Sequence, residues 1–132
     1  DEYQRLSTFP DTADTLASLG NLKLAILSNG TPAMLRAVVR HTGLKDVFSS
    51  ILSVDALGVY KPDPRVYRLV VDNFRLQPEN IGFVSSNCWD ACGAKAFGFS
   101  TFWINRGDAP ADFLGAIPDR IVKSLADIPA LL

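Results

Sequence analysis

The residues best suited to chemistry stand between positions 85 and 90, immediately after an apolar run. Residues 81–84 read Ile-Gly-Phe-Val, and Ser85, Asn87 and Asp90 follow. This pattern is typical of a buried strand that ends at a site and leads into a helix. A carboxylate in the first turn of a helix, beside an amide, can orient and deprotonate a water molecule. The same positions also suit structural roles, with Asn87 as a helix N-cap and Asp90 stabilised by the helix dipole.

A second polar segment, Ser28-Asn29-Gly30, follows the apolar run at residues 24–27. Asn-Gly is typical of tight hairpin turns, but a helical pattern follows here instead of an antiparallel strand. Hydroxyl and amide groups beside the N–H groups of a new helix favour anion binding. Because ligands of parallel sheets bind beyond the carboxyl ends of the strands, we expect both polar segments to line one pocket.

Three further side chains have both a functional and a structural interpretation. Lys61, next to Pro62, could be a solvated lysine or an ammonium group fixed where it keeps a carboxylate ionised. Tyr67 could be a core aromatic residue, and only its hydroxyl group suggests more. Trp89 could line an apolar pocket or pack in the core. The residues alone leave these alternatives open.

Segments with strand and helix patterns alternate along the chain. Apolar runs predict strands at 22–27, 51–54, 81–84, 101–104 and 121–122. Helical spacing, with capping pairs such as Thr31-Pro32 and Asp63-Pro64, predicts helices at 10–19, 31–43, 63–74, 87–97 and from 124 onward. The alternation predicts an α/β fold, a three-layer Rossmann-like sandwich with a parallel sheet. A length of 132 residues fits a single domain over 1–132.

Composition narrows the classes of function. The net charge is −1 and the basic residues are scattered, which argues against binding nucleic acid or an acidic membrane. No apolar stretch has the length of a membrane span, and the polar N-terminus does not resemble a secretory signal. Cys88 and Cys92 lie four residues apart on a predicted helix, which aims them poorly for a disulfide. His41 is the single histidine, too few ligands for zinc, so we expect reduced thiols, no metal and a cytoplasmic protein.

Together these segments resemble the haloacid dehalogenase superfamily, and most closely its L-2-haloacid dehalogenase (type II) branch. The resemblance runs in order from about Pro10 to the last residue. The shared segments are Leu-Ser-Asn-Gly at 27–30, Tyr-Lys-Pro-Asp-Pro-Arg-Val-Tyr at 60–67, Phe-Val-Ser-Ser-Asn at 83–87, Trp-Asp at 89–90, Gly-Ala-Lys-Ala-Phe-Gly-Phe at 93–99 and Trp-Ile-Asn-Arg at 103–106. The resemblance implies a haloacid dehalogenase-like core fold.

The resemblance also implies a reaction, the hydrolytic dehalogenation of small (S)-2-haloacids to (R)-2-hydroxyacids. In this family an aspartate attacks the carbon that bears the halogen, halide leaves, and water then hydrolyses the aspartyl ester. By resemblance, Ser28 holds the substrate carboxylate, and Asn29 helps to cradle the departing halide. Trp89 then forms a wall of the substrate pocket.

The implied catalytic network occupies the second half of the chain. By resemblance, Lys61 keeps the nucleophile ionised and in place, while Tyr67 and Ser85 support that network with hydrogen bonds. Asn87 and Asp90 position and activate the hydrolytic water. Each of these roles is an expectation carried over from the family's motif.

Two departures from the superfamily pattern matter. Ser86 stands where the magnesium-dependent phosphatases usually carry an acidic residue, and loss of a hard oxygen ligand weakens an Mg²⁺ site. The resemblance therefore implies a metal-independent dehalogenase without a cofactor. The family's Asp-x-x-Gly-Thr nucleophile motif is also absent from this sequence, so we expect a partial core that lacks the first strand and the helical cap and is inactive by itself.

Two other functions stay open beside the dehalogenase. One is a superfamily phosphatase, against which Ser86 argues, and the other is a truncated, non-catalytic remnant that binds small anions or a partner chain. Members of the dehalogenase branch are often dimers, so the resemblance also allows a homodimer.

Overall fold

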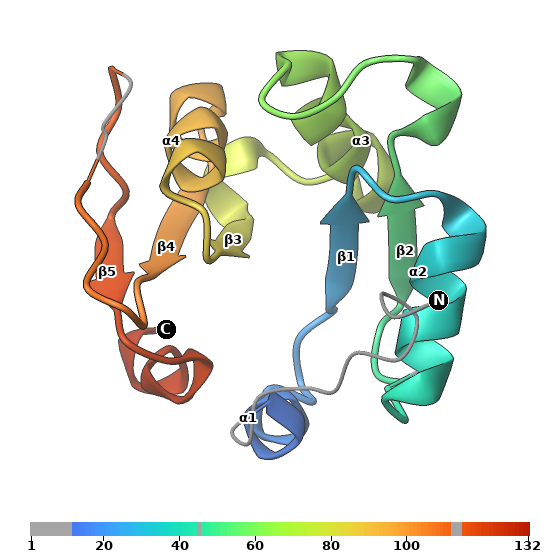
Figure 1. Cartoon of the computed structure of the whole chain (residues 1–132), viewed down its shortest axis with the longest axis horizontal. Coiled ribbons are helices and arrows are strands. Elements are labelled where there is room, and N and C mark those ends of the chain that lie inside the picture. The colour runs from blue at the N-terminus through green and yellow to red at the C-terminus, as the bar shows by residue number, and fades with distance from the viewer. Residues whose placement is uncertain (1–11, 45, 112–114) are drawn as a thin grey trace. The chain divides into compact units, whose positions relative to one another are not determined.

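The computed structural model describes residues 12–44, 46–111 and 115–132. It divides into two compact units, Asp1–Gly58 and Val59–Leu132, each built from short parallel strands and helices (Figure 1). The α/β class with parallel sheets, predicted from the alternating pattern, is therefore confirmed. The single domain expected over residues 1–132 stays a prediction, and the units are described one at a time.

The first unit is a two-stranded parallel sheet with two helices. Its described elements are α1 (Thr12–Ser18), β1 (Ala25–Ser28), α2 (Pro32–His41), β2 (Ser50–Ser53) and the 3₁₀ turn η2 (Asp55–Leu57). β1 pairs in register with β2, so that Ala25 lies opposite Ser50 and Ser28 opposite Ser53. Helix α2 packs on β2 through Leu35 and Val39, the buried residues of its apolar face.

The predicted start of α2 is confirmed in detail. Thr31 is the N-cap and its hydroxyl oxygen accepts a hydrogen bond from the Met34 N–H, while Pro32 occupies the first helical position, where a missing N–H costs nothing. The helix ends at His41 with Thr42 as its C-cap, and Gly43 follows with φ of 76°, a left-handed conformation that glycine adopts without steric penalty.

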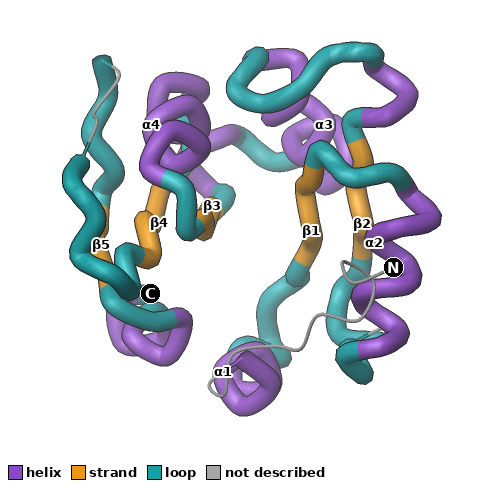
Figure 2. The backbone as a smooth tube through the Cα atoms, viewed as in Figure 1, coloured by secondary structure: helices purple, strands orange, loops and turns teal. Residues whose placement is uncertain are grey.

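The second unit is a three-stranded parallel sheet in the order β3-β4-β5. Its elements are α3 (Pro64–Phe74), the 3₁₀ turn η3 (Pro78–Asn80), β3 (Gly82–Ser85), α4 (Cys88–Phe97), β4 (Ser100–Ile104), β5 (Arg120–Val122) and the 3₁₀ turns η4 (Leu125–Asp127) and η5 (Pro129–Leu131). Figure 2 shows helix α4 beside β3 and β4, the strands against which it packs. Helix α3 packs on α4.

Most of the described core lies in this second unit. β4 is buried along nearly its whole length. Four aromatic rings (Tyr67, Phe83, Phe97 and Phe99) pack in edge-on, tilted or stacked pairs with centroids between 5.1 and 6.0 Å apart. A second cluster consists of Phe102 and Ile104 of β4, Val122 of β5 and Ile128. These contacts hold β3 and α4, the two elements that carry the 85–90 segment.

Two predicted elements differ from the structure. The first strand begins at Ala25, not at residue 22, because the Leu22 N–H turns back to the Leu19 carbonyl and the side chain is 48% exposed. The expected closing helix is only a 3₁₀ turn with a capping box between Ser124 and Asp127. Pro129 follows it, and proline cannot continue a helix from its interior. The expected start of the first helix, at residues 10 and 11, lies outside the described residues.

None of the helices in the described part of the chain has the length and apolar character that a bilayer span requires.

Candidate active site

A buried charge cluster joins Lys61, Tyr67 and Asp90 in the second unit. The Lys61 ammonium group donates a hydrogen bond to Asp90 Oδ2 at 2.9 Å, and the Tyr67 hydroxyl group donates to Asp90 Oδ1 at 2.8 Å. The Asp90 side chain is 3% exposed and that of Lys61 is 11% exposed. A buried carboxylate without partners would be strongly unfavourable, so the two donors explain how the charge is accommodated. All three residues were candidates from the sequence, and the structure brings them together.

Local sequence explains why these three side chains meet. Asp63 caps α3 by accepting a hydrogen bond from the Arg65 N–H, and Pro64 begins the helix, as the Asp63-Pro64 pair predicted. This fixes Lys61 just before the helix and Tyr67 in its first turns. Asp90 lies in the first turn of α4, where the helix dipole stabilises a negative charge. The packing of α3 on α4 then places donor and acceptor side chains in contact.

The electrostatics of the cluster keep Tyr67 a neutral donor. Burial raises the pKa of the Tyr67 hydroxyl group above its ordinary value, and the charge of Asp90 and the hydrogen bond to it raise this pKa further. Lys61 also contacts an aromatic ring, because its ammonium nitrogen lies 5.3 Å from the centroid of Phe83. A cation over an aromatic face is stabilised by the ring quadrupole. Lys61 is therefore held by a carboxylate and an aromatic ring together.

Ser85 and Asn87 lie between β3 and α4. The Asn87 backbone N–H donates to the Ser85 hydroxyl oxygen at 3.1 Å, a local bond that bends the chain from the strand into the helix. Asn87 is the N-cap residue of α4, but its side chain makes no capping hydrogen bond. Its side chain is exposed. The structural interpretation of Asn87 is thus correct for its position and wrong for its side chain.

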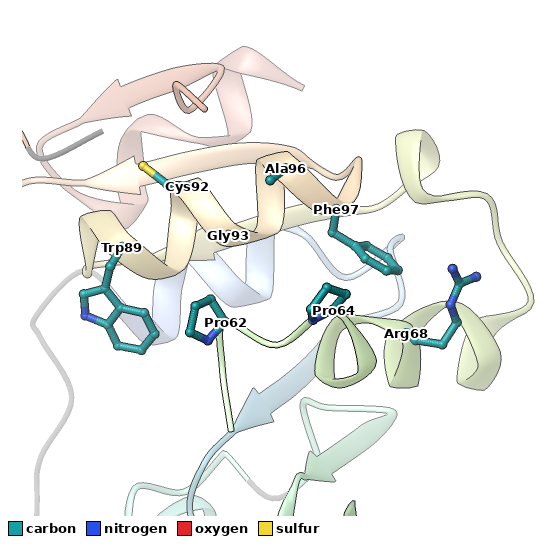
Figure 3. Close-up of a pocket in the computed structure, with 8 residues that line it drawn as sticks. All are labelled: Pro62, Pro64, Arg68, Trp89, Cys92, Gly93, Ala96 and Phe97. Atoms are coloured by element: carbon teal, nitrogen blue, oxygen red, sulfur yellow. The ribbon is translucent and has the colours of Figure 1, made fainter. Parts of the chain in front are cut away.

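Trp89 lines a pocket of about 450 Å³. The indole is 40% exposed, so the core interpretation of Trp89 is wrong. Figure 3 shows the ring on the first turn of α4, near Pro62, with Gly93 and Phe97 further along the same helix. Arg68 closes the far end of this lining, with its guanidinium carbon 5.1 Å from the Phe97 ring centroid. The lining is mainly apolar, with a single positive charge.

Ser28 and Asn29 belong to the first unit, at the end of β1. The Ser28 hydroxyl oxygen accepts a hydrogen bond from the Gly30 N–H at 3.0 Å, and the Asn29 side chain is exposed. Leu35, at 3.3 Å from where a Gly30 Cβ would stand, leaves little room for any side chain there. The pocket that these residues were expected to share with the 85–90 segment stays a prediction.

Three contributors to these strand ends were missed by the sequence analysis. Phe83 contacts Lys61 as described above, and its signal was the two-residue period that puts Phe83 and Ser85 on one face of β3. The Trp103 indole N–H donates to the Ser86 carbonyl oxygen at 3.2 Å. Ser53, at the end of β2, donates to the Gly30 carbonyl oxygen at 2.6 Å. Neither bond carries a local sequence signal, because its partners are 17 and 23 residues apart.

Gly93, a residue without a side chain, makes the close approach of α3 and α4 at this site possible. A Cβ atom at Gly93 would stand 2.7 Å from Pro62 Cβ and 2.9 Å from the Tyr67 hydroxyl oxygen. Such distances are shorter than van der Waals contact, so only glycine fits here without a shift. Gly93 therefore keeps Tyr67 within reach of Asp90.

The described residues contain no group of three or more histidine, cysteine, aspartate or glutamate side chains that could hold a metal ion. The arrangement instead offers a fixed ammonium group, a carboxylate and a neutral phenol. Each oxygen of an ionised carboxylate has about two lone-pair sites. Asp90 can therefore keep its two donors and still accept a hydrogen bond from water.

Comparisons with known proteins give a consistent picture. A family model described as "haloacid dehalogenase-like hydrolase" matches residues 1–98. An (S)-2-haloacid dehalogenase of Pseudomonas sp. (strain YL) is 50% identical over 99% of this chain, and (S)-2-haloacid dehalogenase 4A of Burkholderia cepacia is 43% identical over 98% of it. The solved L-2-haloacid dehalogenase of Xanthobacter autotrophicus matches with a TM-score of 0.91 and 41% identity, over 98% of this chain and 62% of that one. The chain covers 57% of the length of each of the two curated relatives.

Proposed function

Because the chain belongs to the haloacid dehalogenase-like hydrolase family, we propose that the complete protein hydrolyses small (S)-2-haloalkanoic acids to (R)-2-hydroxyacids. The reaction runs through an aspartyl ester. The names of its relatives support the substrate class, since several are (S)-2-haloacid dehalogenases. The close similarity to a solved L-2-haloacid dehalogenase supports the fold on which this chemistry rests.

The observation that carries the proposal is the buried cluster around Asp90. A carboxylate that is 3% exposed, with an ammonium group at 2.9 Å and a phenol at 2.8 Å, is held in one position by two hydrogen-bond donors. Ion pairs of this kind are costly to bury and add little net stability over apolar packing. Their presence at the end of a parallel strand therefore favours a chemical role over a purely structural one.

In the first step the family's nucleophilic aspartate, whose motif is absent from this sequence, forms a bond to C2 of the substrate. The carbon–halogen bond breaks and halide is released. Lys61 keeps that aspartate ionised by its positive charge. Ser28 holds the substrate carboxylate through a hydrogen bond, and Asn29 helps to cradle the halide. Trp89 covers the apolar part of the substrate.

In the second step water attacks the carboxyl carbon of the ester and the hydroxyacid leaves. Asn87, whose side chain does not cap α4, orients the water, and Asp90 accepts its proton. Ser85 holds the turn that carries Asn87 through its bond to the Asn87 N–H. Tyr67 anchors Asp90 as a neutral donor. The proton then leaves with the released products, and the nucleophile is restored.

We further propose that the reaction needs no metal. The support is Ser86, which replaces an acidic residue of the phosphatase pattern. Its side chain offers a neutral hydroxyl group, a weaker Mg²⁺ ligand than a carboxylate. For the same reason, the phosphatase is a weaker candidate function than the dehalogenase.

Three other expectations belong to this proposal. The first is a cytoplasmic location. Nucleic acid is not expected as a partner, because the net charge is −1. A homodimer rests on the family resemblance alone, and light scattering of the purified complete protein tests it.

The decisive experiment incubates the complete protein with each enantiomer of 2-chloropropionate and measures chloride. We expect chloride and (R)-lactate from the (S) enantiomer alone, with a rate that EDTA does not change. Hydrolysis of p-nitrophenyl phosphate that requires Mg²⁺, without chloride release, would support the phosphatase instead. The 132-residue chain alone is expected to release no halide, since it contains no nucleophile motif.

A second experiment isolates the hydrolytic step. In the complete protein, Asp90→Asn should form the ester but hydrolyse it slowly, so that intact mass spectrometry detects the substrate bound to the enzyme. Asp72→Asn, at an exposed position of α3, is the matched control and should turn over normally. Rapid turnover by Asp90→Asn would remove Asp90 from the hydrolytic role.

A further inference from the structure

The two cysteines of the chain lie together on one helix. Cys88 and Cys92 are the only cysteines among the 132 residues, and both are thiols on α4 with their sulfur atoms 3.9 Å apart. Cys88 is half-buried, and Cys92 is 1% exposed but lines the 450 Å³ pocket beside Trp89. No step of the proposed dehalogenation uses either thiol.

Helix geometry makes this pair a poor disulfide. Cβ atoms four residues apart on a helix are separated by about 5–6 Å, whereas a disulfide requires about 3.5–4.5 Å. A direct bond between the two sulfur atoms would therefore distort the first turns of α4. One atom inserted between the sulfurs removes this conflict, because it lengthens the bridge without moving the helix.

We propose that Cys88 and Cys92 form a bidentate site for a single thiophilic atom, with trivalent arsenicals as the ligand class. Thiolates are soft ligands that select soft metals and related electrophiles. With phenylarsine oxide the reaction is balanced without any oxidant. Two As–S bonds form, two S–H bonds and the arsenic–oxygen bond break, and the oxygen leaves with both protons as water. The oxidation states of sulfur and arsenic do not change.

The site is independent of the proposed dehalogenation, since it needs only the two thiols and an intact α4. Its position has a spectroscopic consequence. Trp89 follows Cys88 directly in the first turn of α4, and Figure 3 shows Trp89 and Cys92 on the same stretch of the helix. A heavy atom held between the two sulfurs should quench the fluorescence of Trp89.

The test measures the binding of phenylarsine oxide to the folded protein by intact mass spectrometry and by tryptophan emission. The wild type should take up one phenylarsenic unit with loss of two hydrogens, and its fluorescence should fall. Two linked contacts exceed a single contact by roughly 10²–10⁴-fold in affinity. The adduct should therefore survive excess glutathione and be removed by a small dithiol such as 2,3-dimercaptopropanol.

The matched controls are Cys88→Ser and Cys92→Ala, each of which leaves one thiol. Both should lose the glutathione-resistant adduct, with a drop in affinity of that order, while circular dichroism shows a retained fold. If Cys92→Ala does not fold, the half-buried Cys88→Ser decides alone. Equal retention by a single-thiol variant would overturn the proposal. So would a wild type that binds the arsenical only after denaturation, because the site would then not exist in the folded helix.

Discussion

Both units of the molecule place polar residues directly after a parallel strand, but different forces hold the two strand ends. After β1 in the first unit, neutral hydrogen bonds connect Gly30 with Ser28 and Ser53, and the Asn29 side chain is exposed. Beside the end of β3 in the second unit, an ion pair between Lys61 and Asp90 is buried. The hydrogen bonds after β1 set the course of the backbone, whereas the ion pair beside β3 holds two charged side chains in place.

The surrounding packing follows the same division. Every residue of β1 is only half-buried, whereas β4 is buried along nearly its whole length. A buried charge pair needs a dense surrounding to keep its geometry, and the aromatic rings of the second unit supply it. A strand end held by neutral bonds tolerates solvent, because water can replace a lost partner. The comparison predicts that substitutions at the strand end of the second unit lower the free energy of unfolding far more than substitutions at the strand end of the first.

The largest expected effect is that of Lys61→Met. Removing one partner of a buried ion pair leaves Asp90 without its counter-charge and should lower the free energy of unfolding by about 3–5 kcal/mol. Arg65→Met is the matched control, since Arg65 pairs with Asp63 in an ion pair with the arginine side chain 68% exposed. Water screens exposed pairs, so this variant should lose far less stability. Urea denaturation gives both values, and equal losses would show that the Lys61 pair is not buried.

Next in size is Gly93→Ala. Its Cβ would stand 2.7 Å from Pro62 Cβ and 2.9 Å from the Tyr67 hydroxyl oxygen, and overpacking of this kind costs about 1–3 kcal/mol. Gly107→Ala is the control, because nothing lies within 4 Å of where its Cβ would stand. Hydrogen exchange should show lower protection in α3 and α4 of Gly93→Ala. Unchanged protection there would separate Gly93 from the Tyr67–Asp90 contact.

How much of this was predictable depends on the range of the interaction. The starts of α2 and α3 followed from Thr31-Pro32 and Asp63-Pro64, because capping acts within three residues. The late start of β1 did not, since an apolar run does not say where strand pairing begins. The prediction of a closing α-helix was wrong, because Pro129 limits the segment to 3₁₀ turns.

The site divides in the same way. The 85–90 cluster was visible as a local pattern, but the partner of Asp90 lies 29 residues away at Lys61. No periodicity encodes such a pair. The family resemblance put both residues in one active site, but with Lys61 beside the nucleophile and not beside Asp90. The open alternatives for Tyr67 and Trp89 needed side-chain exposure, which is 0% for one and 40% for the other. Exposure depends on the whole fold and not on neighbours in sequence.

The pH dependence of stability sharpens the comparison further. Because the pKa of Tyr67 is raised in the folded state by burial and by Asp90, the unfolded chain loses this proton first as the pH rises. The contribution of Tyr67 is complete below pH about 10 and then falls by about 1.4 kcal/mol for each further pH unit. Tyr67→Phe should remove this alkaline loss. Tyr60→Phe, at a residue 60% exposed, should retain it.

The smallest effect belongs to the first unit, at Ser53. Its hydroxyl group donates to the Gly30 carbonyl oxygen at 2.6 Å and accepts from the Asp55 N–H at 3.1 Å, so Ser53→Ala should cost about 1 kcal/mol. Ser49→Ala, which loses an exposed bond to the Leu24 carbonyl oxygen, should cost less, because water replaces that partner. Hydrogen exchange should localise the Ser53→Ala loss to the segments after β1 and β2. Because neutral bonds hold this strand end, high salt should leave the loss unchanged, and a strong salt dependence would mean that charge matters in both units.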